Sequence, residues 1–129
     1  VAMVETPYED LLRRVLAGGV HWDAMFRDGQ PVGYLSYGRE GDAVKLHKLY
    51  LLASARGHGI AFRAMERVEA HATRLGLVHV TLNVNRHNVR AIKAYEKFGF
   101  HAVREEVNDI GGGFAMDDFV MVKQVHRLS

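Results

Sequence analysis

The chain has 129 residues, of which 48% are hydrophobic and 25% charged, which is the ordinary composition of one globular domain with a real core. Its 17 basic residues stand against 15 acidic ones, and the basic residues are dispersed along the chain rather than clustered. The sequence therefore lacks the basic patch of a nucleic-acid-binding domain, and no nucleic-acid partner is expected.

The absence of certain residue types and motifs excludes several kinds of functional site. The chain has no cysteine, which excludes disulfides, thiolate metal sites and a covalent acyl-cysteine mechanism. Its eight histidines show no HxH or HExxH spacing, so we expect no metal. No signal peptide or membrane span is recognisable, and a cytoplasmic protein with no membrane partner is expected.

The first part of the chain predicts one helix and three strands. A helix is expected from Pro7 to Ala17, because proline and acidic residues favour its start and Gly18-Gly19 its end. Three strands joined by hairpin-like turns should follow, at His21 to Arg27, Pro31 to Tyr37 and Ala43 to Leu52. The turns are expected at 28–30 and 39–42, so this part reads as an antiparallel meander.

A glycine-bearing turn then joins the third strand to a long helix. The turn is Arg56-Gly57-His58-Gly59-Ile60-Ala61, and it follows a short polar loop at 53–55. Apolar residues then recur on one helical face, at Ile60, Ala64, Val68, Ala72 and Leu75. Glycines allow a close backbone approach, and the free N–H groups and dipole of a helix start attract anions. A phosphate or pyrophosphate is the expected ligand, although the glycines could simply make a tight turn.

Only one of three phosphate-binding patterns fits this turn. A P-loop needs a lysine and a hydroxyl where Ala61 and Phe62 stand, and the dinucleotide fingerprint lacks its third glycine at Phe62. The turn instead resembles the acetyl-coenzyme A motif of the GNAT family of N-acetyltransferases, Q/R-x-x-G-x-G/A, which is matched by Arg56, Gly59 and Ala61.

A second motif follows a strand expected at Val78 to Val84. The segment from Asn83 to Phe100 resembles the family's second signature, N-x-x-A-x-x-x-Y-x-x-x-G-F, matched by Asn88, Ala91, Tyr95, Gly99 and Phe100. Asn88 should cap this helix, and Gly99 should end it in the left-handed conformation. Because Asn88 and Tyr95 are seven residues apart, both can point at one ligand.

Two strands are expected to close the chain, at His101 to Asp109 and Phe114 to Val122. The glycine run 111–113 between them predicts a hairpin tip, with a mobile rim over a substrate as the alternative. Dimers are common in the family the motifs resemble. This hairpin offers an edge on which a homodimer could form, but nothing in the spacing requires one.

The resemblance implies the GNAT fold over a single domain, residues 1–129. This is a mixed α/β sheet with helices on both faces, of order β-β-β-α-β-α-β-β after the first helix. The strands ending at Leu52 and at Val84 would run parallel and splay apart around the pantetheine arm. The family usually opens with a further strand and helix. Either Val1 to Glu5 is an abbreviated first strand, or the natural N-terminus is absent from this chain.

The resemblance also implies which residues bind acetyl-CoA, the expected cosubstrate. Backbone groups of the third strand would pair with pantetheine like an added strand, and N–H groups of the turn would hold the pyrophosphate. The full set is Leu49, Tyr50, Leu51, Arg56, Gly57, His58, Gly59, Ile60, Ala61 and Asn88.

Direct transfer to an amine needs an acid and a base. The family gives the acid role to the tyrosine at the position of Tyr95, whose phenol can protonate the leaving sulfur; the alternative is a ring that only packs on the sheet. As the base we consider His47, which strand alternation would place on one face with Leu49 and Leu51. His47 is equally compatible with a histidine satisfied by its strand neighbours.

The sequence indicates less about the amine acceptor than about the cosubstrate. Asn83 stands where many peptide-acetylating relatives carry a glutamate, which weakens a reading as a protein or peptide N-terminal acetyltransferase. The run MDDFVM, with Asp117 and Asp118, resembles an ending seen in the polyamine-acetylating branch and favours a small cationic amine. At most one of the two aspartates can face the pocket. A non-catalytic acyl-CoA-binding module stays as the alternative function.

Overall fold

The computed structural model describes residue 13, residues 17–112 and residues 114–125. Three strands come first, β1 (His21–Arg27), β2 (Gln30–Glu40) and β3 (Ala43–Leu51), and a 3₁₀ turn, η1 (Ala53–Ala55), leads to helix α2 (Ile60–Arg74). Strand β4 (His79–Asn85), helix α3 (Val89–Phe98) and strands β5 (His101–Gly111) and β6 (Phe114–Gln124) follow. The predicted order of elements is confirmed from the first strand onward. The helix expected at 7–17 and the short strand expected at 1–5 lie mostly or wholly outside the described residues.

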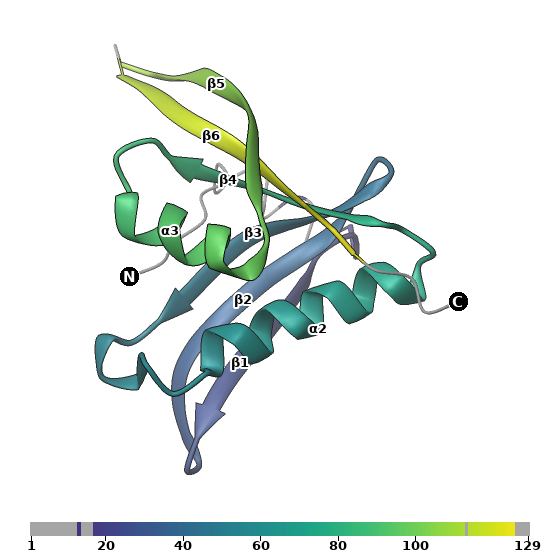
Figure 1. Ribbon diagram of the computed structural model, residues 1–129, viewed down its shortest axis with the longest axis vertical. Coiled ribbons are helices and arrows are strands. Elements are labelled where there is room, and N and C mark those ends of the chain that lie inside the picture. The colour runs from purple at the N-terminus through teal and green to yellow at the C-terminus, as the bar shows by residue number, and fades with distance from the viewer. Residues whose placement is uncertain (1–12, 14–16, 113, 126–129) are drawn as a thin grey trace.

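The described strands form one mixed sheet of order β1-β2-β3-β4-β6-β5 (Figure 1). Strands β3 and β4 are parallel, and the other neighbouring pairs are antiparallel. A parallel pair needs a crossover connection, and α2 supplies it. The prediction of a mixed α/β sheet is therefore confirmed.

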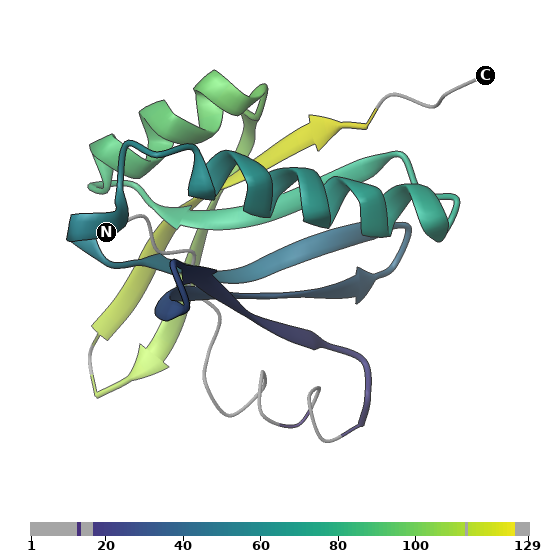
Figure 2. The same cartoon turned by 90° about the horizontal axis from the view of Figure 1, so that it is seen from below.

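Both described helices lie on the same face of the sheet (Figure 2). Their buried residues join one core cluster, with Met65 and Val68 coming from α2 and Ala91 and Tyr95 from α3. The family fold also leads us to expect a helix on the opposite face, but the helix predicted at 7–17 is largely outside the described part of the chain. No described helix is both long enough and apolar enough to cross a membrane.

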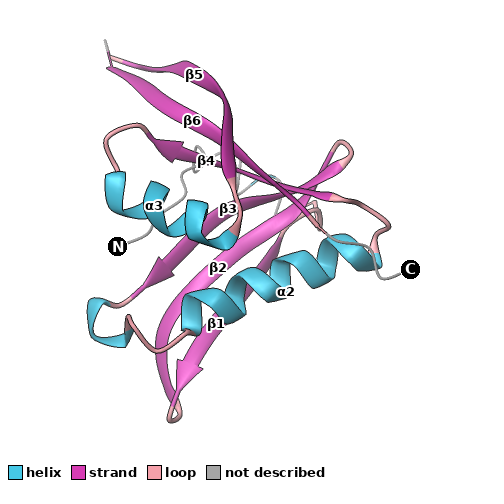
Figure 3. Ribbon diagram, in the orientation of Figure 1, coloured by secondary structure: helices cyan, strands magenta, loops and turns pink. Residues whose placement is uncertain are grey.

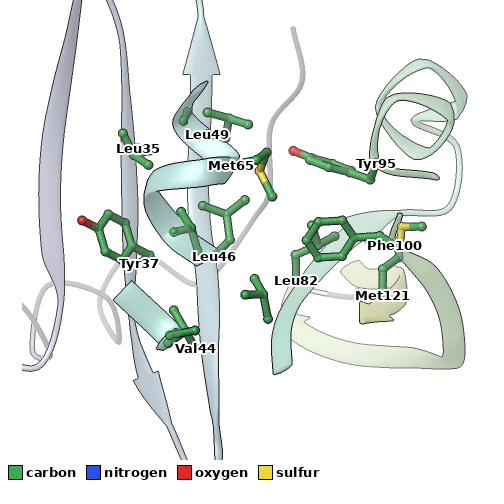
Figure 4. Close-up of a cluster of buried hydrophobic side chains, with 14 of the residues drawn as sticks. Leu35, Tyr37, Val44, Leu46, Leu49, Met65, Leu82, Tyr95, Phe100 and Met121 are labelled. Atoms are coloured by element: carbon green, nitrogen blue, oxygen red, sulfur yellow. The ribbon is translucent and has the colours of Figure 1, made fainter. Parts of the chain in front are cut away.

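The core lies between α2 and the central strands (Figure 4). Helix α2 buries Ala64, Met65, Val68 and Ala72, as its periodicity predicts in the main. Leu75 is an exception, because the helix ends at Arg74 and leaves this leucine 40% exposed at the C-cap. Met65 fills the core instead, against strand residues such as Leu46 and Leu82.

Several strands are longer than the sequence indicates. Strand β2 continues to Glu40, and β3 begins at Ala43, so the predicted four-residue turn is a two-residue turn at 41–42. Arg39 and Glu40 are exposed but still pair with β3, opposite Val44 and Ala43. Polar composition alone therefore placed the turn too early, because exposed polar residues can extend an antiparallel ladder.

The parallel pair separates after a short ladder. Strands β3 and β4 pair only from Val44 to Leu46 and from Val80 to Leu82. The last three residues of β4 continue to pair with β6 on its other side, and so follow the β5–β6 hairpin away from β3. Figure 1 shows the C-terminal ends of β3 and β4 diverging, with α3 between them. The predicted splay of this pair is present.

Candidate active site

The turn before α2 leads directly into the start of that helix (Figure 3). This helix start has no side-chain cap. Gly59 is the N-cap residue, and no residue of the first turn is acidic. The first N–H groups of a helix have no acceptor within the helix, and they carry the positive end of its dipole. This end of α2 is therefore suited to hold an anion.

Gly57 and Gly59 are required by their backbone conformation. Their φ angles are 82° and 75°, in the left-handed region that other residues disfavour. A Cβ atom added at either position would meet no protein atom within 4 Å. The space in front of the turn is consequently open, so these glycines shape a surface rather than relieve a crowded core.

An open cleft of about 440 Å³ lies between this turn, the end of β3 and the outer side of α3. Its described lining comes from four parts of the chain. The residues are Leu49, Leu51, Arg56, Gly57, Gly59, Ile60, Ala61, Phe62, Arg90, Ala94, Lys97 and Phe98. No acidic residue belongs to this lining, so the charged groups that border the cleft are all cationic.

The cations of the cleft differ from others in the chain. Arg67 pairs with Asp23 at 2.7 Å, and Arg86 pairs with Asp117 at 2.9 Å. In contrast, Arg56, Arg90 and Lys97 form no ion pair with any residue that the structure describes. Three uncompensated cations around one cleft favour an anionic ligand with more than one charged group.

Most of the residues implied for cosubstrate binding lie around this cleft, but three do not line it. Tyr50 points to the other face of β3, where its ring stacks on Tyr34 at 5.6 Å between centroids. His58 is exposed on the turn. The side chain of Asn88 accepts a hydrogen bond from the N–H of Ala91 at 3.3 Å, so Asn88 caps α3 as predicted.

Sequence reasoning missed the α3 wall of the cleft. Arg90, Ala94 and Lys97 line it, together with Phe62 and Phe98. Arg90, Ala94 and Lys97 are spaced by four and then three residues, so they lie on one side of the helix. This spacing in the sequence could have indicated a shared surface. It was not recognised because the family signature directs attention to the buried stripe of the same helix.

Tyr95 belongs to the core shared by α2, α3 and β3 and does not line the cleft. The residue is 1% exposed, and its hydroxyl has no hydrogen-bond partner among the described residues. Figure 4 shows this hydroxyl directed toward Met65 of α2. Burial raises the pKa of Tyr95 above its ordinary value, so the phenol stays protonated at neutral pH. A buried and unpartnered O–H group is a costly feature that invites a functional explanation.

His47 sits at a break in the β2–β3 ladder. Ser36 pairs with Lys48, and the next residue, Tyr37, pairs with Leu46, so β3 carries His47 as an extra residue. The bulge interrupts the simple alternation from which a common face for His47, Leu49 and Leu51 was expected, so that placement stays a prediction. The imidazole is fully buried.

The polar residues near the end of β4 differ in burial. Asp117 accepts a hydrogen bond from Arg86, whereas Asp118 is 1% exposed and lies opposite Asn85 in the β4–β6 ladder. Asn83, two pairs further along the same ladder, is also buried. The prediction that at most one of the two aspartates faces the pocket stays a prediction. No described group of three or more His, Asp or Glu side chains is arranged to hold a metal.

A match to a known protein family identifies the family of this chain. The model of the Acetyltransferase (GNAT) family matches residues 3–100, which is most of the chain. The protein therefore belongs to the GNAT family.

Individual relatives agree with this assignment. An uncharacterized N-acetyltransferase of Mycobacterium bovis is 38% identical over 99 residues, and the match covers 76% of this chain. The matched part spans only 63% of that relative's own length. A corresponding protein of Mycobacterium tuberculosis gives the same identity and coverage.

Solved structures share the fold. A GNAT family acetyltransferase from Elizabethkingia anophelis with acetyl-CoA bound has a TM-score of 0.74 at 12% identity, covering 93% of this chain and 85% of that one. A ribosomal-protein-alanine N-acetyltransferase from Brucella melitensis has a TM-score of 0.68 at 23% identity, covering 91% and 75%. At these identities the likeness concerns the fold.

Proposed function

We propose that the chain is an N-acetyltransferase domain that moves the acetyl group of acetyl-CoA directly to a primary amine, with a small amine or polyamine as the favoured acceptor. The observation that carries the proposal is the cleft at the start of α2. It joins an uncapped helix N-terminus and three cations that have no ion-pair partner among the described residues to the end of β3, where β3 and β4 part.

The outer part of the cleft fits the phosphates of the cosubstrate. The N–H groups at the start of α2 and the open space before Gly57 and Gly59 can accommodate a pyrophosphate. Arg56 and Arg90 border the same space and have no described carboxylate partner. The charge of the ligand would thus be balanced by groups that no described carboxylate neutralises.

The inner part fits the pantetheine arm. Beyond Leu46 no described strand pairs with β3 on its β4 side, so the backbone edge from Leu49 to Leu51 is available for hydrogen bonds. The side chains of Leu49 and Leu51 line the cleft and offer an apolar surface. An extended amide-bearing arm can add to such an edge in the way a peptide strand does.

Tyr95 is proposed as the acid. When bound, acetyl-CoA supplies an activated acetyl group as a thioester. The hydroxyl of Tyr95 is buried, protonated and without a described partner, and so it can donate a proton to the sulfur that leaves. Leu49, which lines the cleft, belongs to the same core cluster as Tyr95, and this shared packing supports the assignment.

His47, or a water that it orders, is proposed as the base. The bulge at His47 falls one residue beyond the last β3–β4 pair, where the two strands begin to separate. An imidazole is suited to take a proton from an amine near neutral pH. Asp118, which is buried at the end of β6 beside β4, is the alternative base.

The test is acetyl-CoA consumption, measured as thiol release, against polyamines, arylalkylamines, amino acids and N-terminal peptides. We expect one class of small amine to raise thiol release well above the rate without amine, with the acetylated amine detected by mass spectrometry. Turnover with peptides alone would instead identify a peptide N-terminal acetyltransferase. Tight acetyl-CoA binding without thiol release would favour a non-catalytic acyl-CoA-binding module.

A further inference from the structure

One residue joins the loop after β4 to both strands of the β5–β6 hairpin. Arg86 directly follows β4, and its guanidinium pairs with Glu105 of β5 at 2.7 Å and with Asp117 of β6 at 2.9 Å. Its backbone N–H also donates to the carbonyl oxygen of Asp117 at 3.0 Å. The guanidinium carbon lies 4.9 Å from the centre of the Phe119 ring, which packs against the core. Arg86 thus contacts three residues of the hairpin at once.

These contacts fix a geometry more than they add stability. The side chains of Arg86, Glu105 and Asp117 are 32%, 59% and 41% exposed, and exposed ion pairs contribute little to folding. A guanidinium that meets two carboxylates and an aromatic ring is nevertheless held in one orientation. Among the ion pairs between described residues, Arg86 is the only cation with two carboxylate partners. The contribution of Arg86 therefore lies in the positions that it fixes.

The contacts of Arg86 lie where the hairpin leaves the sheet. Strand β6 pairs with β4 only from Asp118 to Gln124, whereas its ladder with β5 continues beyond this point to Gly111 and Phe114. In the described sheet, the far part of the hairpin has no neighbouring strand except its own partner (Figure 1). Loss of the contacts at this root would therefore free the hairpin to change its angle to β4.

Two groups of the proposed chemistry flank this root. Asp118, the alternative base, is buried and pairs in the ladder with Asn85, the residue before Arg86. Helix α3, which carries the proposed acid Tyr95, begins after its N-cap Asn88, two residues beyond Arg86. A change at Arg86 therefore reaches both groups through short stretches of backbone.

We propose that Arg86 is a positioning residue for acetyl transfer, which locks the root of the β5–β6 hairpin to the start of α3 and so fixes the side of the β3–β4 opening from which the amine approaches. This inference rests on the proposed function. Neither Arg86 nor the hairpin residues that it contacts belong to the described lining of the cleft assigned to acetyl-CoA. Loss of the contacts should therefore change how the amine meets the acetyl group without changing how the cosubstrate binds.

The experiment measures kcat, the KM of the amine and the dissociation constant of acetyl-CoA for the full chain, well below its melting temperature. Arg86→Met should lower kcat/KM for the amine roughly 10- to 100-fold, since a misplacement of about 1 Å can cost that much, and should leave acetyl-CoA binding unchanged. Arg86→Lys keeps the charge without the planar fork and should recover part of the loss. Arg67→Met removes another ion-paired arginine, whose partner Asp23 lies at 2.7 Å, and as the control it should keep the parent kcat and KM.

A variant of the partner tests the contact itself. Asp117→Asn removes one carboxylate at nearly constant size and should reproduce a smaller part of the loss. Arg86→Met combined with Asp117→Asn should be no slower than Arg86→Met alone, because both changes act through one contact. Thermal unfolding of each variant checks that the chain is folded.

Three results would overturn the inference, and they differ from failure of the proposed function. They are parent values of kcat and KM in Arg86→Met, fully additive losses in the double variant, and a loss of acetyl-CoA affinity as large as the loss in kcat/KM. If Arg86→Met does not fold, parent values in Asp117→Asn overturn it as well. A folded parent protein that releases no thiol with any amine would instead refute the proposed function, and this inference with it.

Discussion

Phe62 and Phe98 pack ring against ring with their centroids 5.3 Å apart, and so connect the first turn of α2 to the last turn of α3. Both rings border the cleft. An aromatic residue that is more than half exposed usually contributes little to folding, which leaves ligand binding as the reason to keep Phe62 in this position.

Replacing Phe62 tests this interpretation. Phe62→Ala should lower the affinity for coenzyme A about tenfold, since burying an exposed phenylalanine side chain against a ligand contributes roughly 1.5–3 kcal/mol. The free energy of unfolding should fall by only about 1 kcal/mol through loss of the ring pair. Phe26→Ala, at a 62% exposed position of β1 outside the cleft, is the control and should leave the affinity unchanged. Equal losses of affinity in the two variants would contradict a role for Phe62.

Alanine substitutions at Gly59 and Gly41 distinguish the cost of backbone strain from a loss of ligand binding. Both have left-handed φ angles, 75° and 63°, and at both an added Cβ meets no protein atom within 4 Å. Either glycine replaced by alanine should therefore cost about 1–2 kcal/mol of stability. Only Gly59→Ala should also weaken coenzyme A binding, because its methyl group enters the cleft. Calorimetric titration of both variants checks this, and an equal loss of affinity in Gly41→Ala would count against the site.

Tyr95 should make the folded chain sensitive to alkali. An unfolded tyrosine ionises near pH 10, and burial raises the pKa of Tyr95 in the folded state. The unfolded chain then binds fewer protons above about pH 10, so stability that is full below this pH falls as the pH rises further. The melting temperature of Tyr95→Phe should fall less between about pH 9 and pH 11 than that of the parent. Tyr37, whose pKa is also raised, is present in both proteins, so the difference isolates Tyr95. Parallel curves would contradict the burial of an ionisable phenol.

His71 should make the stability of the folded chain sensitive to acid. Burial, with help from His21 and Arg74, lowers the pKa of His71 against an opposing effect of Asp23. The unfolded chain therefore binds more protons below about pH 6.5, and stability is lost as the pH falls through the folded pKa. Denaturant unfolding between about pH 7 and pH 5 should show a shallower loss for His71→Gln. His87→Gln, which removes an exposed imidazole, is the control, and it should keep the slope of the parent.

Much of the fold could be predicted because local patterns and tertiary packing agree. The strand order along the chain, the N-cap at Asn88 and the stop at Gly99 all follow from residue types whose preferences the structure respects. What failed depends on non-local contacts. The bulge at His47 arises from the pairing of β3 with β2, and no feature of the β3 sequence announces it.

The candidate site likewise has one part that local sequence patterns predict and one part that depends on non-local contacts. The turn and the end of β3 were predicted from a motif, because glycines in left-handed conformations and a following helix leave a clear local pattern. The α3 wall could not be assigned to the cleft without knowing that α2 and α3 lie side by side on one face. Arg90 and Lys97 look like ordinary surface cations until the fold places them around the same cleft as Arg56.

The most direct test of the proposed mechanism is the turnover number of Tyr95→Phe with the best amine of the panel, measured at saturating acetyl-CoA. Loss of the hydroxyl removes the acid and leaves the ring that fills the core. We therefore predict a fall in kcat of roughly 10²-fold or more, with acetyl-CoA binding and the melting temperature near pH 7 little changed. A Tyr95→Phe variant that turns over at the parent rate would contradict the assignment of Tyr95 as the acid.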